Sequence, residues 1–137
     1  MGEIDIRKVD DALAYLEELK GAGSSQLAFD LVFVDADKQR LKDYVVSILD
    51  GDLLAEGGVM VVDNVLWKGL AGDNNSDSDA GAGDFEVEIV ETKKSRRQRK
   101  LARIMHEFNE WAHQDERLDV VLLPLRDGLS IIRRRSI

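Results

Sequence analysis

The 137 residues, 44% of them hydrophobic and 34% charged, are enough for one domain with a core of its own, covering residues 1–137. The sequence has no apolar run near the roughly 20 residues that cross a bilayer and no signal-peptide pattern at its start, so we expect a cytoplasmic protein with no membrane partner. The absence of cysteine excludes disulfides and thiolate sites, and a net charge of −8 argues against nucleic-acid partners.

The first elements predicted along the chain are short. Residues 4–6 alternate apolar and acidic side chains and predict a strand fragment. A helix follows, because Asp10 or Asp11 can cap its first turn and apolar residues then recur at helical spacing, at Leu13, Leu16 and Leu19. Residues 21–25 are rich in glycine and serine, and we expect them to end this helix.

A strand, a helix and a second strand come next. Residues 31–34 are all apolar, which is typical of a strand buried on both faces. The helix has the stripe of a helix packed on a sheet, at Leu41, Tyr44, Val45, Ile48 and Leu49. Gly57 and Gly58 indicate a tight turn, and residues 59–62 a second buried strand. This pattern predicts two parallel strands joined by a right-handed crossover.

The second half of the chain begins with a polar stretch. Residues 69–84 are mainly Gly, Asp, Asn, Ser and Ala, so we expect a mobile surface loop, and residues 85–90 alternate briefly and predict an edge strand. A long helix follows, with its apolar stripe at Leu101, Ile104, Met105, Phe108, Trp111 and Ala112. Residues 118–123 and 129–132 predict two strands that an Asp-Gly turn joins into an antiparallel hairpin.

Polar side chains gather where the two central strands end. Asp35, Asp37 and Lys38 follow the first strand, and Asp63 and Asn64 follow the second. Because ligands of open α/β sheets bind outside the carboxyl ends of the strands, we expect these groups to share a site. Two carboxylates and an amide oxygen suit Mg²⁺, Mn²⁺ or Ca²⁺ and leave positions for substrate, and the lysine could serve as a base. The alternative interpretation is that these acids cap the following helices.

Four segments carry a resemblance to a known family. Residues 29–38 read FDLVFVDADK, residues 57–69 read GGVMVVDNVLWKG, and residues 107–110 and 122–131 read EFNE and LLPLRDGLSI. In this order they resemble the cation-dependent O-methyltransferases, in particular the caffeoyl-CoA O-methyltransferase branch, which is related to catechol O-methyltransferase. The resemblance implies an α/β, Rossmann-like methyltransferase fold whose mostly parallel sheet closes with a C-terminal antiparallel hairpin.

The resemblance also implies a reaction and roles for individual residues. Asp35, Asp63 and Asn64 match the family's three ligands of a divalent metal, and Asp35 also lies next to the substrate. Lys38 matches the general base toward the accepting hydroxyl. The implied reaction moves the methyl group of S-adenosylmethionine to a phenolic hydroxyl of a small-molecule acceptor that is catechol-like or a hydroxycinnamoyl-CoA.

The remaining matches concern the two substrates. Asp11, Ala12 and Asp37 match positions that line the S-adenosylmethionine pocket. Trp67 matches an aromatic wall of the acceptor site, and Lys68 a position that can touch the substrate. Members of the family commonly form homodimers, so a homodimer is a possible assembly of this chain.

Two departures from the family pattern affect these expectations. Members begin with a strand and a glycine-rich turn, followed by an acid for the ribose hydroxyls, and the sequence contains neither, so the fold would be incomplete, with a free sheet edge and an uncovered core face. The basic segment 93–100 replaces tyrosines of plant members and suits either a solvated helix start or contact with acyl-CoA phosphates. The alternative function is therefore a truncated, non-catalytic remnant that keeps a metal-binding or dimerising surface.

Overall fold

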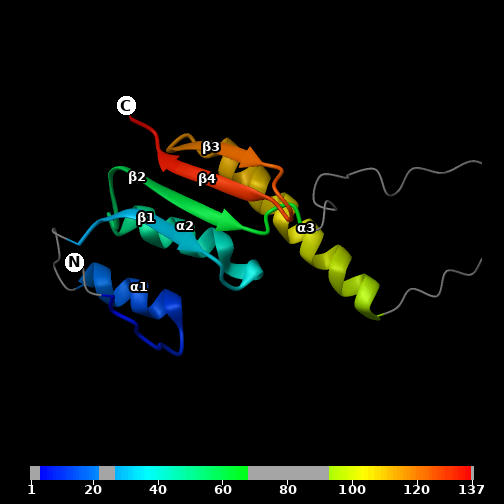
Figure 1. Cartoon of the computed structure of the whole chain (residues 1–137), viewed down its shortest axis with the longest axis horizontal. Helices are drawn as coiled ribbons and strands as arrows, with labels where there is room; N and C mark the ends of the chain where they lie inside the picture. Colours follow the sequence, from blue (N-terminus) through cyan, green and yellow to red (C-terminus); the bar gives the residue numbers. More distant parts are fainter. Residues whose placement is uncertain (1–3, 22–26, 68–92, 137) are drawn as a thin grey trace, which may run out of the picture.

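The computed structural model describes residues 4–21, 27–67 and 93–136, which form a sheet with helices packed against it (Figure 1). The helical elements are α1 (Ala12–Gly21), the 3-10 turn η1 (Lys38–Arg40), α2 (Leu41–Asp50) and α3 (Lys93–Gln114). The strands are β1 (Phe29–Val34), β2 (Leu54–Asp63), β3 (Leu118–Leu123) and β4 (Leu129–Arg134). This order confirms the predicted strand, helix, strand unit and the hairpin near the C-terminus.

The sheet has four strands in the order β1-β2-β4-β3. β1 and β2 pair in parallel, whereas β4 pairs antiparallel with both β2 and β3. The expectation of a mostly parallel sheet is therefore confirmed only in part: among the described strands one pairing of three is parallel, although β1, β2 and β3 run in the same direction. Placing β4 between β2 and β3 brings the hairpin turn beside the end of β2.

One face of the sheet packs on α2 and α3 and forms the core. Alternate strand residues contribute to it, and they are fully or almost fully buried: Val34, Met60, Val62, Leu118 and Ile132. All five residues of the predicted α2 stripe are buried, as are Met105, Phe108 and Ala112 of α3. α1 lies beside α2, where its three leucines pack against this core and Ser47 Oγ donates a 2.7 Å hydrogen bond to Glu17 Oε1.

The other face of the sheet is apolar and exposed. Leu31 and Phe33 of β1 are 63% and 60% exposed, and Val121 of β3 is 57% exposed. The prediction that residues 31–34 are buried on both faces is wrong, because an all-apolar run shows what each face is made of and not whether a second layer covers it. The expected free edge and uncovered face are confirmed, since β1 ends the strand order and, within the described residues, pairs only with β2.

Two further predictions of local structure are wrong. Residues 4–6 form no strand, and Ile4 and Ile6 are more than 80% exposed, because they pair with no described strand that would give them a surface to pack on. Gly57 and Gly58 lie within β2 instead of ending a turn before it. The register with β1 jumps there, from Leu54 to Val59, and Gly57 has a φ of +75°, so the pair forms an irregularity in a longer strand.

Several predictions fall on residues outside the described ranges. They include the substrate position Lys68, the loop of residues 69–84 and the edge strand of residues 85–90. Of the described helices, none combines the length and the apolar character that crossing a membrane requires.

Candidate functional site

The carboxyl ends of β1 and β2 lie next to each other and bring the predicted residues together. Val34 pairs with Val62, so Asp35 and Asp63 follow at the same end of two neighbouring parallel strands. The Lys38 ammonium joins them: Nζ donates to Asp35 Oδ1 at 3.1 Å and to the Asp63 backbone oxygen at 3.1 Å. The Lys38 side chain is only 13% exposed, whereas that of Asp35 is 58% exposed. A sheltered cation thus lies between oxygens of both strands.

Asn64 occupies a sharp turn immediately after β2. Its φ is +62°, in the left-handed region that asparagine tolerates better than most residues. The Asn64 backbone N–H donates to Asp63 Oδ1 at 2.7 Å, and the Asn64 carbonyl accepts a 3.3 Å hydrogen bond from the Trp67 N–H. The turn therefore keeps Asp63, Asn64 and Trp67 close to the end of the strand.

The oxygen atoms available as ligands at this strand end suit a hard divalent cation. Carboxylates of Asp35 and Asp63 and the side-chain amide of Asn64 offer oxygen ligands, and the Lys38 ammonium already holds a positive charge between the two strand ends. The described ranges contain no group of three or more His, Cys, Asp or Glu side chains that could hold a metal ion. A site here consequently depends on Asn64 as the third ligand, as the sequence predicts, and the metal itself stays a prediction.

The hairpin turn between β3 and β4 holds the turn after β2. The Val65 N–H donates to the Gly128 carbonyl at 3.2 Å, and the Leu66 N–H donates to the Asp127 carbonyl at 2.8 Å. Gly128 has a φ of +85°, and a Cβ atom on it would lie 2.6 Å from Leu66 Cγ and 2.8 Å from the Leu66 nitrogen. Only glycine fits this approach. The Asp-Gly pair in the sequence predicts a turn, but it does not predict that this turn contacts the site.

Helix α3 supports the same turn from another side. Trp67 Nε1 donates to Gln98 Oε1 at 3.0 Å, and Asn109 Nδ2 donates to the Val65 carbonyl at 2.8 Å. The sequence does not mark either α3 residue as a site residue, although Asn109 lies in the EFNE motif and Gln98 is one of the two uncharged residues of the basic segment 93–100. That segment begins α3, and the charged residues 96, 97, 99 and 100 are exposed, which supports a solvated helix start.

The residues predicted to line the S-adenosylmethionine pocket lie at the starts of two neighbouring helical elements. Asp11 caps α1, because its Oδ1 accepts from the backbone N–H groups of Leu13 and Ala14, and it pairs with Arg40 at 3.2 Å. The hydrogen bond from Arg40, followed by that from Leu13, lowers the pKa of Asp11 below its usual value. Asp37 Oδ1 accepts from the Gln39 N–H and caps η1.

Capping is thus confirmed for both of these aspartates, whereas their contact with S-adenosylmethionine stays a prediction. Arg40 connects the two helix starts, because it lies in η1, which Asp37 caps, and pairs with Asp11 at the start of α1. Ala12 is the first residue of α1. The structure therefore gathers Asp11, Ala12 and Asp37 along one side of the β1 end.

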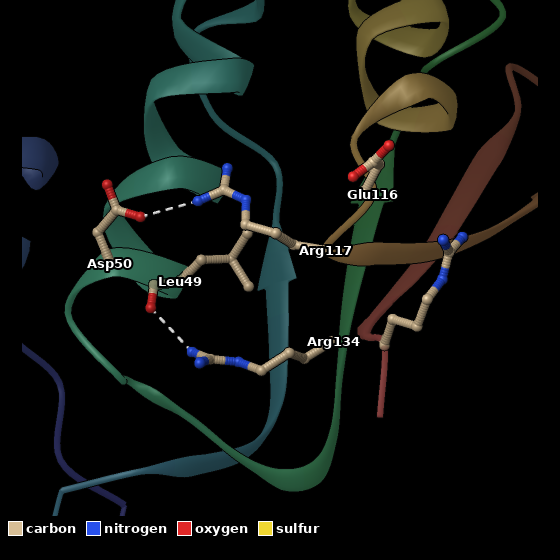
Figure 2. Close-up of a pocket in the computed structure, with 6 residues that line it drawn as sticks. Leu49, Asp50, Glu116, Arg117 and Arg134 are labelled. Atoms are coloured by element: carbon tan, nitrogen blue, oxygen red, sulfur yellow. Dashed lines mark hydrogen bonds and ion pairs between the residues drawn. The ribbon is translucent and has the colours of Figure 1, made fainter. Parts of the chain in front are cut away.

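A hollow of about 620 Å³ lies at the opposite end of the sheet, away from the predicted site (Figure 2). Figure 2 shows Arg117 directed at Asp50, at 3.1 Å, and Arg134 directed at the Leu49 carbonyl, at 2.8 Å. Arg117 also pairs with Asp115 at 2.7 Å, and that hydrogen bond lowers the pKa of Asp115 to about 2. These guanidinium groups already have partners, so the hollow is a paired-charge region and not a ready anion site.

The model of the family described as O-methyltransferase matches residues 2–135, which is nearly the whole chain. The chain belongs to the O-methyltransferase family. Among curated relatives, the O-methyltransferase ankF of Aspergillus thermomutatus is 34% identical over 109 residues, covering 79% of this chain and 41% of the relative. The caffeoyl-CoA O-methyltransferase of Petroselinum crispum is 31% identical over 138 residues, covering 98% of this chain and 48% of the relative.

A solved structure agrees with this assignment of the family. The SAH-bound Podospora anserina methyltransferase PaMTH1 matches with a TM-score of 0.66 and 30% identity, covering 88% of this chain and 46% of that one. The chain thus spans less than half the length of each of these three relatives. Within that span the family fold is Rossmann-like, as the resemblance implied.

Proposed function

We propose that this chain carries the metal-binding and acceptor-binding part of an S-adenosylmethionine-dependent O-methyltransferase that methylates a phenolic hydroxyl of a catechol-like or hydroxycinnamoyl-CoA acceptor. The supporting observation is the Lys38 ammonium, which lies 3.1 Å from both the Asp35 carboxylate and the Asp63 carbonyl in a chain of this family. Carboxylates, an amide and a sheltered lysine at one strand end are the groups that a metal-assisted methyl transfer to oxygen needs.

In this proposal, different side chains have different roles in the reaction. Asp35, Asp63 and Asn64 would hold a divalent cation, which, when bound, favours the ionised form of a chelated hydroxyl. Lys38 must be the neutral amine for this step; it then takes the hydroxyl proton while the sulfur–carbon bond of the donor breaks and the carbon–oxygen bond of the product forms. The low exposure of the Lys38 side chain limits competition from water for that proton.

Two neighbouring groups orient the reactants in this proposal. Trp67 offers an aromatic wall to the acceptor, and its hydrogen bond to Gln98 fixes the ring plane. Asp11, Ala12 and Asp37 line the donor side, where the Arg40 contact keeps the start of α1 beside the β1 end. Holding both reactants near one point supplies the alignment that an in-line transfer requires.

A second candidate function is a non-catalytic remnant that keeps a metal-binding or dimerising surface. The observation that favours it is the exposed apolar face with Leu31, Phe33 and Val121, next to the free edge of β1. An apolar patch of this kind often marks a contact with another polypeptide. A homodimer through this face would fit the remnant and the enzyme alike.

Donor binding separates the two functions. Calorimetric titration of the full chain with S-adenosylmethionine and Mg²⁺ should give saturable heat, and Asp37→Ala should abolish it. Asp37→Asn is the matched control for folding, because it keeps an oxygen acceptor for the Gln39 N–H while removing the charge. The absence of heat with folded wild-type chain at near-millimolar donor would favour the remnant.

Metal dependence tests the chemistry of the site directly. A chelator should abolish methyl transfer to a catechol acceptor, and Asp35→Ala and Asp63→Ala should do the same because each removes one oxygen ligand. The measurement is product formation with labelled donor before and after Mg²⁺ is restored. Undiminished turnover in metal-free buffer would refute the metal role.

A further inference from the structure

Asn109 makes one long-range contact and leaves one atom without a partner. Its Nδ2 donates to the Val65 carbonyl at 2.8 Å across 44 positions of sequence. Its Oδ1 is buried and has no hydrogen-bond partner among the residues that the structure describes. The orientation of the amide follows from chemistry, because a carbonyl can only accept and the nitrogen must therefore face it.

A buried acceptor without a partner disfavours folding. A leucine side chain has the same number and branching of heavy atoms as asparagine, although it is somewhat larger, and it would leave no unpaired oxygen. Packing alone therefore gives no reason for an amide at this position of α3. The contact that an amide adds is the hydrogen bond to Val65.

Val65 is the residue after Asn64 and is fully buried. Its N–H is bound to the Gly128 carbonyl of the hairpin turn, and its carbonyl is bound to Asn109 of α3. The peptide group on each side of Val65 is thus fixed by a different element. Fixing them both also fixes Asn64, whose φ of +62° is an unusual conformation that a freer turn would leave.

We propose that Asn109 is a positioning residue for the metal site: by holding the Val65 carbonyl, it helps to keep Asn64 in its left-handed backbone conformation, from which the side-chain amide oxygen would serve a divalent cation as a ligand. This inference rests on the proposed function, because it assumes Asn64 as a metal ligand. Asn109 itself touches neither metal nor substrate and acts through the turn of residues 64–67. It belongs with Gly128 as support of that turn.

The test is Mn²⁺ binding to the full chain, measured by the loss of the free-ion signal in electron paramagnetic resonance. Asn109→Leu should weaken Mn²⁺ binding at least tenfold while its urea midpoint stays near that of wild type. Met105→Leu is the control, because it changes a buried residue of the same helix with little change of volume and leaves the turn untouched. Its Mn²⁺ affinity should equal that of wild type.

A second variant protects the test against a folding defect. Asn109→Asp keeps the size of the side chain but places a carboxylate oxygen against the Val65 carbonyl, so it should also weaken Mn²⁺ binding and speed amide exchange at Val65 and Leu66. Equal Mn²⁺ affinity in wild type and both variants would overturn the inference alone. No Mn²⁺ binding by wild type would overturn it together with the metal role in the proposed function. Loss of folding in both variants would show a core role and overturn the inference.

Discussion

The two ends of the sheet hold similar charged groups in different arrangements. At the carboxyl ends of β1 and β2, one lysine contacts Asp35 and a backbone carbonyl, and the Asp35 carboxylate is more than half exposed. At the opposite end, Arg117 contacts both Asp115 and Asp50, and Arg134 contacts Asp52 and the Leu49 carbonyl.

This difference distinguishes a stabilising charge cluster from the one to which we assign a reaction. Arginine forms planar, directional contacts and stays charged, which suits permanent ion pairs between elements. Lysine is a point charge on a flexible chain that can give way to another cation or carry a proton. An incompletely paired carboxylate beside such a lysine can exchange its partner for a ligand, whereas the arginine end cannot do so without breaking several contacts.

The largest expected effect comes from substituting the cations at the two ends of the sheet, Lys38 and Arg117. Lys38→Met should lower kcat/KM for a catechol acceptor by about 10²- to 10⁴-fold, the usual range for loss of a general base. Mn²⁺ binding to the same variant should become tighter, because the ammonium no longer competes for Asp35 Oδ1. Steady-state kinetics and Mn²⁺ titration measure the two effects.

Arg117→Met is the matched control at the opposite end, since it also removes a cation that pairs with carboxylates. It should leave kcat/KM and Mn²⁺ affinity unchanged. Similar losses of activity in the two variants would mean that the ends do not differ in function.

The second prediction concerns the glycine that supports the site. Gly128→Ala should lower the free energy of unfolding by roughly 2–5 kcal/mol, because a left-handed conformation costs an alanine about 1–2 kcal/mol and the close approach to Leu66 adds about 1–3 kcal/mol. Urea unfolding measures the change. Gly57→Ala is the control, since Gly57 shares the positive φ but has no atom within 4 Å of the new Cβ. A loss of only about 1–2 kcal/mol is expected there, from the left-handed conformation alone.

Equal losses at the two glycines would show that the contact with Leu66 contributes nothing. If Gly128→Ala also weakens Mn²⁺ binding in the fraction that remains folded, the hairpin turn and the site are coupled, as the hydrogen bonds to Val65 and Leu66 indicate.

Local patterns in the sequence predicted much of this architecture. The α2 stripe repeats at helical spacing over a complete helix, so its five buried residues could be named in advance. Asp35, Lys38 and Asp63 could be grouped because parallel neighbouring strands end at the same edge, and the structure joins them through the lysine. In these cases periodicity or strand direction alone determines where the side chain lies.

Features that depend on residues distant in the sequence could not be predicted from local patterns. The exposure of Leu31 and Phe33 depends on which layers surround the sheet, and that information is not contained in the four residues of the run. Gly128 fits a turn signal, but its need for glycine arises from Leu66, 62 positions earlier. Gln98 and Asn109 reach the turn only because α3 folds back over the end of β2. Single polar residues on a helix carry no sign of such long-range contacts.

The smallest expected effect concerns acid stability at the arginine end. The hydrogen bond from Arg117 holds the pKa of Asp115 at about 2, below the usual 3.8, so the stabilisation is complete above pH 4 and is lost as the pH falls from about 4 to 2. A shift of this size corresponds to about 2 kcal/mol, and we expect about 1 kcal/mol because Arg117 is half exposed and screened by solvent. Asp115→Asn should therefore destabilise the chain at pH 7 by this amount and by progressively less below pH 4.

Urea unfolding at pH 7, 4 and 2.5 measures this dependence. Asp50→Asn is the control, because Asp50 contacts the same arginine but its side chain is 53% exposed, whereas that of Asp115 is 12% exposed. The exposed pair should contribute less at every pH, since solvent screens it more strongly. A pH-independent effect of Asp115→Asn would mean that packing or the backbone hydrogen bond to Arg117, and not the charge, connects α3 to β3 at this end of the sheet.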